Sequence, residues 1–254
     1  MVALQFRRVR EPKLLWMMSM RSIFVYCMGC PISALLLSFA LGSVFHPHAL
    51  FSYEWTCGTV HLPSISRVIN MPLERTIVQV LLLFSVPLRL IVLLKHWLEY
   101  SVIDQSRWFV LVRRLMVLCG AADVLFLSLL STIGERENGD LHVALFAGFA
   151  ASTYIYFVSI CLLTKRTSDS SPSGALRAVL QLTFLSFVSF GIPVIFLLFI
   201  LYNVFCVPFT YELFALFEYA TVASIYAFHL SSLSLMSGSI YIIHNSIKAP
   251  AKRV

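Results

Sequence analysis

Ionisable side chains lie inside stretches of this chain that are otherwise apolar. The stretch FEYATVASIYAFHL, residues 217–230, carries Glu218 and His229 eleven positions apart. Eleven residues are about three turns of an α-helix, so both side chains fall on one helix face. Arg89 and Asp123 lie in two other apolar stretches. Because ionisable groups inside a membrane normally face the protein interior and pair there, these four residues predict a buried polar cluster.

Three of these charges lie at similar predicted depths. Counted at about 1.5 Å per residue from the same membrane face, Arg89, Asp123 and Glu218 lie roughly 14–20 Å deep. We therefore predict that Arg89 bridges both carboxyl groups, while His229 bonds a neighbouring backbone or headgroup. The cluster has two interpretations: a structural clasp that fixes helix packing, or a polar cavity for a lipid headgroup or a proton.

Histidines form a second group that could do chemistry. His46, His48 and His61 belong to one long connection, and His142 begins a later apolar stretch. No spacing typical of zinc ligands joins them, so no metal site and no cofactor are predicted. His142, with His46 nearby, is placed to act as a general base for ester chemistry at a lipid headgroup. No G-x-S-x-G nucleophile motif accompanies these residues, and ordinary interfacial histidines are the alternative.

The composition is that of a membrane protein with several spans. Of the 254 residues, 59% are hydrophobic and 12% are charged, and the mean hydropathy is +0.86. A soluble domain carries about a quarter charged residues. The net charge of +7 does not indicate a nucleic-acid partner, because the basic residues are scattered between apolar runs rather than gathered on one surface.

Six apolar stretches reach the length of about 20 residues that one membrane crossing needs. Residues 178–211 contain 34 positions without a charge, so we expect two helices there, separated by a turn near 203–208. The first stretch is too long and begins too late for a cleaved signal peptide, and is interpreted as a signal anchor. The predicted spans are 22–45, 76–98, 113–133, 141–163, 178–201 and 209–232.

Lysine and arginine positions predict the orientation. Fifteen of the 19 lie on one side, in residues 1–21, in two connections and in the tail 237–254, and such an excess marks the cytosolic side. The predicted fold class is therefore an all-α polytopic membrane bundle over residues 22–236, with six transmembrane helices and both termini cytosolic. The only long lumenal connection is expected at 46–75.

Two of the six cysteines lie in predicted lumenal connections, namely Cys57 and Cys206. The other four lie within spans, where cysteine usually acts as a small apolar residue. Because the secretory lumen is oxidising, the two exposed thiols suggest a disulfide between the long loop and the turn before the last helix. Two separate unpaired thiols are the alternative.

Two regions resemble a known family. The stretch CGTVHLPSIS (57–66), followed by Pro72 and SVPLR (85–89), resembles the first lumenal loop and second helix of the post-GPI-attachment-to-proteins factor 2 family. That family lies within the wider FRAG/DRAM/Sfk group of six-span proteins. A second set of residues keeps the spacing of the factor family itself: Asn203, Cys206, Tyr211, Phe214, Ala215, Glu218, Tyr219, Val222, Ala227, Phe228 and His229.

The resemblance covers about residues 20–232 and implies a multi-pass protein of the Golgi membrane, or of the endoplasmic reticulum as well. It implies a role in remodelling the lipid of glycosylphosphatidylinositol (GPI) anchors. In that pathway an unsaturated chain is removed and a saturated one is put back on the lyso intermediate, which keeps GPI-anchored proteins at the cell surface. The implied partners are the GPI-anchor lipid, other membrane lipids and a second remodelling enzyme.

Several functions stay open at the level of the sequence. A member of this family either transfers the acyl chain itself, as an acyltransferase, or acts as an accessory factor, and the acyl donor is unknown. The rival class is a non-enzymatic membrane scaffold or regulator. A small transporter is a weaker alternative, because transporters usually contain repeated halves with broken helices, and Pro31, Pro87 and Pro193 define no matching halves.

Overall fold

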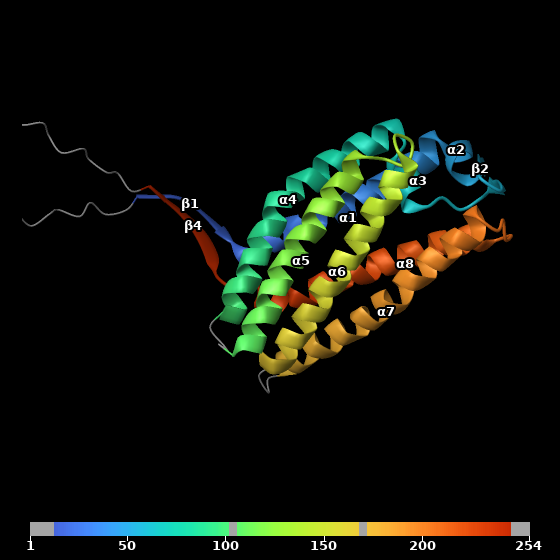
Figure 1. The fold of residues 1–254 in the computed structure, drawn as a ribbon. Coiled ribbons are helices and arrows are strands. Elements are labelled where there is room, and N and C mark those ends of the chain that lie inside the picture. Colours follow the sequence, from blue (N-terminus) through green and yellow to red (C-terminus); the bar gives the residue numbers. More distant parts are fainter. Residues whose placement is uncertain (1–12, 102–105, 168–171, 245–254) are drawn as a thin grey trace, which may run out of the picture.

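The computed structural model describes residues 13–101, 106–167 and 172–244. Six helices in these ranges are long and apolar enough to cross a membrane and run side by side (Figure 1). This confirms the predicted all-α membrane bundle. The basic residues before position 13 and after position 244, which were used to predict the orientation, lie outside the described ranges. The helices are α1 (Met20–Phe45), α4 (Pro72–Ser101), α5 (Arg107–Thr132), α6 (Gly139–Thr167), α7 (Pro172–Asn203) and α8 (Thr210–Ser231), which the 3-10 helix η1 (Ser232–Leu235) continues.

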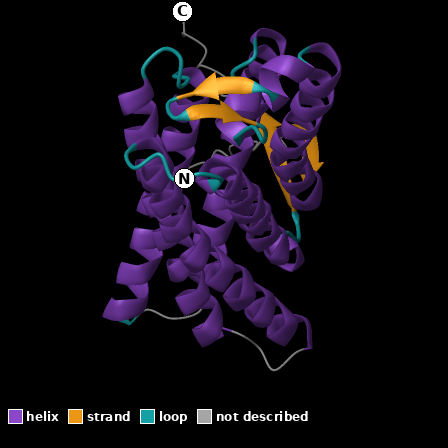
Figure 2. Cartoon of the chain, turned by 90° about the vertical axis from the view of Figure 1, so that its right-hand side faces the viewer, coloured by secondary structure: helices purple, strands orange, loops and turns teal. Residues whose placement is uncertain are grey.

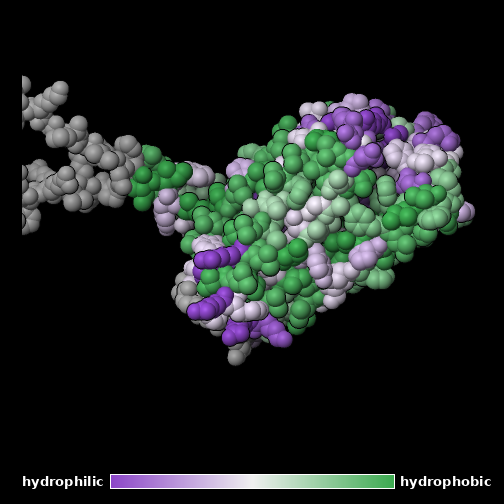
Figure 3. Space-filling model, in the orientation of Figure 1, coloured by the Kyte–Doolittle hydropathy of each residue, from purple (hydrophilic) through white to green (hydrophobic). Residues whose placement is uncertain are grey.

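On the face of the bundle that Figure 3 shows, apolar side chains cover most of the long side, and hydrophilic residues gather toward its two ends. Large hydrophobic residues such as Leu36, Leu118 and Phe190 are more than half exposed along these sides. A soluble protein rarely exposes so continuous an apolar surface. The long sides of the bundle therefore face lipid.

The helices extend beyond the apolar stretches from which they were predicted. Helix α4 begins at Pro72 instead of near residue 76, and α5 begins at Arg107 instead of near 113. Ser106 caps α5 by accepting a hydrogen bond from the backbone N–H of Phe109. Arginine is a good helix former, so the helix continues through basic residues where the hydrophobic run has already ended.

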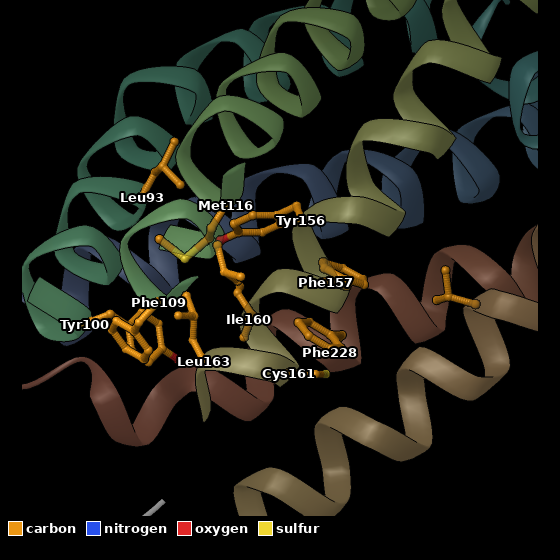
Figure 4. Close-up of a cluster of buried hydrophobic side chains, with 12 residues drawn as sticks. Leu93, Tyr100, Phe109, Met116, Tyr156, Phe157, Ile160, Cys161, Leu163 and Phe228 are labelled. Carbon is orange, nitrogen blue, oxygen red and sulfur yellow. The ribbon is translucent and has the colours of Figure 1, made fainter. Parts of the chain in front are cut away.

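The largest cluster of buried side chains lies toward the end of the bundle at which α4 ends and α5 begins. Here α4, α5, α6, α7 and α8 meet, as Figure 4 shows, and the rings of Phe157 and Phe228 stack at 3.7 Å between centroids. Along the bundle, α1 packs on α4, α4 on α5, α5 on α6, and α7 on α8. The cluster consists of Leu93, Tyr100, Phe109, Val112, Met116, Tyr156, Phe157, Ile160, Cys161, Leu163, Val188 and Phe228.

The connection between α1 and α4 folds into a cap over one end of the bundle, which we call the loop end. Its strands pair antiparallel, with Tyr53 opposite Val60, and Figure 2 shows this small sheet among the helices. Gly58 has φ +124°, a backbone conformation that favours glycine at the turn. The cap consists of α2 (Pro47–Phe51), β2 (Tyr53–Trp55), β3 (Gly58–Val60) and α3 (Ile65–Ile69).

A second sheet joins segments on either side of the six long helices. Strand β1 (Lys13–Ser19) pairs antiparallel with β4 (Ser239–His244), at the end opposite to the cap, which we call the terminal end (Figure 1). Strand β4, SIYIIH, is rich in isoleucine and tyrosine, which favour strands, whereas β1, KLLWMMS, is apolar but consists mostly of leucine and methionine. The sequence could not predict the pairing because the two partners lie at opposite ends of the chain.

Candidate functional site

An ion pair lies near the middle of the bundle, between α4 and α5. Nη1 of Arg89 lies 3.7 Å from Oδ2 of Asp123, and both side chains are buried. Thr153 of α6 donates a hydrogen bond from its hydroxyl to Oδ1 of Asp123. The pair thus links three helices, which is the arrangement expected of a structural clasp.

Glu218 has a different partner from the one expected, and this is a correction. Its Oε2 accepts a hydrogen bond of 2.8 Å from the backbone N–H of Ile65, at the start of α3, rather than an ion pair with Arg89. The depth argument considered only positions along the helices. In the structure the cap reaches into the loop end of the bundle, so its backbone arrives at Glu218.

His229 lies between aromatic rings of α6. Its ring centroid is 6.0 Å from that of Tyr156 and 5.2 Å from that of Phe157. The side chain is buried and lines the same narrow cavity, of about 100 Å³, as Arg89 and Glu218. The four residues of the predicted polar cluster, Arg89, Asp123, Glu218 and His229, therefore line one space, although the carboxyl groups bind different partners.

A larger cavity of about 470 Å³ lies at the loop end, between the cap, α6, α7 and α8. We call it the loop-end cavity. Ser66, Phe146 and Glu218 line both this cavity and the narrow one, so the two spaces adjoin. Its polar lining consists of Thr56, Ser64, Ser66, Glu135, Asp140, His142, Asn203, Tyr211 and Glu218, and its apolar lining consists of Trp55, Val143, Phe146, Ile195, Phe196, Phe199 and Phe214, with Gly139.

His142 makes two hydrogen bonds at the wall of this cavity. Its Nδ1 lies 2.8 Å from the carbonyl oxygen of Ile133, and its Nε2 lies 3.0 Å from the hydroxyl oxygen of Ser66. A carbonyl oxygen can only accept, so Nδ1 carries the proton in this contact. In the neutral ring Nε2 then holds the lone pair and accepts the hydrogen bond that Ser66 donates.

Side chains of α8 hold the short helix that carries this serine. Tyr211 donates a hydrogen bond of 3.3 Å to the hydroxyl of Ser64 and accepts one of 2.8 Å from Tyr53. Tyr219 donates a hydrogen bond to the carbonyl oxygen of Pro63. Because these contacts come from a membrane helix, the position of α3 is fixed relative to the cavity wall.

Glu135 faces the same cavity from the connection between α5 and α6. Its Oε1 is buried and has no hydrogen-bond partner among the described residues. Burial raises the pKa of Glu135 above its ordinary value, and the nearby charges of His142, Arg67 and Arg136 act in the opposite direction. The loop-end cavity therefore contains a serine, an imidazole and a carboxyl group.

Cys57 and Cys206 are joined by a disulfide, with their Cα atoms 5.3 Å apart. The bond ties the turn between β2 and β3 to the turn between α7 and α8. Next to it, Nε1 of Trp55 and the hydroxyl of Thr56 donate hydrogen bonds of 3.2 and 3.1 Å to the side-chain oxygen of Asn203. These bonds attach the cap to the α7–α8 side of the cavity.

Residues 19–234 match the family model described as the Frag1/DRAM/Sfk1/Cwh43P N-terminal domain. The chain belongs to this family. The match runs from the end of β1 into η1, so it contains all six long helices and both cavities. No curated protein and no solved structure matches the chain.

Within this family domain the predicted site residues do not all meet. His46 lies at the junction of α1 and α2 and is not among the residues that line either cavity. His61 is exposed and contacts the carbonyl oxygen of Phe51 through Nδ1 at 3.2 Å. In the described part of the chain, no three His, Cys, Asp or Glu side chains form a group that could hold a metal ion.

Sequence reasoning missed Ser66 and Glu135. Ser66 lies 76 residues before His142 and in no nucleophile motif, so only the folded cap brings the two side chains together. One available signal was that Ser66 ends the stretch CGTVHLPSIS, which carries the family resemblance. Glu135 lies in an acidic turn, GERENGD, whose other charged residues are exposed. The sequence of this turn therefore gave no sign that the Glu135 side chain faces a cavity.

Proposed function

We propose that this protein takes part in the lipid remodelling of GPI anchors, in the step that restores a fatty-acyl chain to a lyso-GPI-anchored protein. The observation that carries this proposal is the loop-end cavity, which places polar groups beside an apolar wall. A volume of about 470 Å³ lies within the usual range of small-molecule sites, roughly 300–1,000 Å³.

The polar and apolar parts of the cavity lie at different depths. His142 and Asn203 lie close to the loop end of their helices, whereas Phe146, Phe199 and Ile195 lie about one to two turns farther into the bundle. A lyso lipid has the same division, with a free hydroxyl near its headgroup and one apolar chain. The cavity therefore fits a lyso lipid with its hydroxyl near His142.

The residues that carry the resemblance to the factor family build this cavity. Cys57 and Cys206 attach the cap to the α7–α8 turn. Glu218 and Tyr219 hold the backbone at the start of α3, and Ser66, the last residue of the stretch CGTVHLPSIS, binds His142. Because this signature builds one site, the narrower family relationship supports a shared activity at that site.

The proposal includes a location and an orientation. With both termini in the cytosol, the loop end faces the lumen of the Golgi or endoplasmic reticulum, where the disulfide Cys57–Cys206 is stable. The partners are GPI-anchor lipids, membrane lipids and a second remodelling enzyme. Epitope tags at both termini should bind antibody in cells whose plasma membrane alone is permeabilised. Tags that require permeabilised Golgi membranes would contradict this orientation.

The direct test is complementation of cells that lack the reacylation step. The full chain should restore the surface level of a GPI-anchored reporter and the saturated chain in its anchor lipid, measured by flow cytometry and mass spectrometry. His142→Ala should reduce both without reducing the amount of protein. His48→Ala, which changes an exposed histidine of the cap, is the matched control and should act like the wild-type chain.

Two results would separate this proposal from its alternatives. If the wild-type chain reaches Golgi membranes but leaves the anchor lipid unchanged, the proposed function is wrong. If the anchor lipid is restored equally by wild type and by His142→Ala, the imidazole takes no part in the reaction, which favours the non-enzymatic scaffold.

A further inference from the structure

The contact between Ser66 and His142 has the geometry of a nucleophile with its base. A hydroxyl and an imidazole nitrogen within about 2.6–3.2 Å, with the ring oriented by a third group, are the structural sign of an activated nucleophile. Here the separation is 3.0 Å, and the third group is the carbonyl oxygen of Ile133, 2.8 Å from Nδ1. That carbonyl occupies the place that a carboxylate holds in a Ser-His-Asp triad.

The serine is also placed where a substrate can reach it. Ser66 is half-buried and lines both the loop-end cavity and the adjoining narrow cavity. Phe146 lines the same two spaces, one turn deeper along α6 than His142. An acyl chain lying against this wall would bring its carbonyl carbon toward the serine hydroxyl.

We propose that Ser66 is an acyl-carrying nucleophile with His142 as its base, so that the chain passes through an ester on Ser66. The donor assigned by this site is a glycerophospholipid, because an ester lipid can enter an apolar cavity from the bilayer. The acceptor is the free glycerol hydroxyl of a lyso lipid. The identity of this acceptor rests on the function proposed above. The formation of an acyl ester on Ser66 does not depend on that function.

The reaction is a balanced exchange of esters in two halves. In the first, Oγ of Ser66 bonds to the acyl carbonyl carbon while Nε2 of His142 takes the hydroxyl proton. The bond from the acyl carbon to the donor glycerol oxygen then breaks, and that oxygen takes the proton from Nε2. In the second half, the acceptor hydroxyl gives its proton to Nε2 and attacks the acyl-serine. The serine oxygen leaves and takes the proton back, so no oxidant, reductant or water is consumed.

The test uses the purified full chain in nanodiscs of diacyl phosphatidylcholine that carries a deuterated palmitoyl chain. After acid quenching without acceptor, peptide mass spectrometry should find the deuterated acyl group on Ser66. The ester should resist neutral hydroxylamine, which removes acyl groups from cysteine. Ser66→Ala should lose the modified peptide, and His142→Ala should slow its formation about 100-fold or more. Ser52→Ala, at an exposed serine of the cap, should leave it unchanged.

A second variant keeps the test decisive if Ser66→Ala folds poorly. Ser66→Cys retains a side chain that can pair with His142, and the imidazole favours the thiolate. Iodoacetamide should therefore modify the cysteine of Ser66→Cys at least about 10-fold faster than that of the matched control Ser52→Cys. Replacing His142 by Ala in the Ser66→Cys background should remove this difference.

Several results would overturn the inference. A folded wild-type chain with no acyl group on Ser66 excludes the covalent intermediate, and equal rates in wild type and His142→Ala exclude the base. Acylation by palmitoyl-CoA but not by phosphatidylcholine overturns the assigned donor. Complementation of the reacylation-deficient cells by Ser66→Ala overturns the nucleophile while leaving the proposed function intact. Conversely, acyl-Ser66 in a chain that fails complementation supports the nucleophile and rejects only the GPI acceptor.

Discussion

The middle of the bundle and its loop end both hold polar side chains among apolar helices, but they use them differently. In the middle, Asp123 binds both Arg89 and Thr153, which links three helices beside a cavity of about 100 Å³. At the loop end, Ser66 and His142 bind one another beside a cavity of about 470 Å³. In the middle, the charged groups of Arg89 and Asp123 bind one another. At the loop end, Ser66 and His142 line a cavity large enough for a ligand.

This difference shows why charge inside a membrane is a poor guide to the reactive site that we propose for this protein. A buried charge must find a partner, and the partner is often structural. The hydroxyl of Ser66 carries no charge, so this half-buried side chain needs no counter-ion and lines the cavity beside the buried His142. Changes to the ion pair in the middle should therefore act mainly on stability, and changes to Ser66 or His142 mainly on activity.

The largest expected effect on stability comes from Arg89→Ala. It leaves Asp123 buried without its cation, and removing one member of a buried ion pair costs about 3–5 kcal/mol. We expect low abundance and a large decrease in the thermal unfolding midpoint of the protein in detergent. Arg114→Ala, at an exposed arginine of α5, should change neither.

A milder variant sharpens this result. Asp123→Asn keeps a side-chain oxygen that can accept the hydrogen bond of Thr153, but it leaves Arg89 without a counter-charge. If Arg89→Ala and Asp123→Asn both gave normal abundance and an unchanged unfolding midpoint, the middle of the bundle would not depend on this pair. The contrast between the two regions would then be lost.

Removal of the disulfide should have the next largest effect. Cys57→Ser or Cys206→Ser opens a link between residues 149 positions apart, and loss of a native disulfide destabilises by about 2–4 kcal/mol. Thermal unfolding in detergent should show the same decrease for each single variant and for the double variant. Cys30→Ser, at a free cysteine of α1, should change the midpoint much less. Additive effects of the two serine substitutions would contradict a shared bond.

The sequence predicted the six helices from the length of the apolar stretches and the disulfide from the oxidising compartment. It missed the contacts that the folded cap makes with the helices. Apolar runs were sufficient for the six helices because each crossing needs about 20 residues. Glu218 and Ser66 show what the sequence could not predict. Glu218 accepts a hydrogen bond from a backbone N–H of the cap, and the folding of the cap brings Ser66 to His142. Spacing along single helices carries no information about such contacts. The sheet of β1 and β4 was missed for the same reason.

Loss of one hydroxyl from the contacts that hold α3 should have a smaller effect. Tyr211→Phe removes the oxygen that binds both Tyr53 and Ser64 and leaves the buried hydroxyl of Tyr53 without this acceptor. We expect a loss of about 1 kcal/mol of unfolding free energy, measured as a small decrease in the unfolding midpoint. Acylation of the serine in α3 should slow as its helix becomes less fixed. Tyr26→Phe, on the exposed side of α1, is the matched control and should alter neither quantity.

The smallest expected effect is a change in how stability depends on pH. Burial raises the pKa of Glu135 above the ordinary 4.5, so the folded state holds this proton at pH values where the unfolded chain has lost it. Stability therefore falls as pH rises from about that ordinary value through the folded pKa. Glu135→Gln cannot ionise, so it should match wild type below this range and exceed it at neutral pH.

The comparison of unfolding midpoints at acidic and neutral pH measures this effect directly. His142, Arg67 and Arg136 all act on Glu135 and favour its ionised form; if their attraction exceeded the penalty of burial, Glu135→Gln would instead be less stable than wild type at neutral pH. Glu137→Gln provides the contrast, because the Arg75 partner lowers the pKa of that exposed carboxyl. Glu137→Gln should therefore lower the stability of the protein at neutral pH, whereas Glu135→Gln should raise it. Two neighbouring carboxyls with opposite responses would show that the loop-end cavity, and not the surface beside it, holds an acid that favours its protonated form.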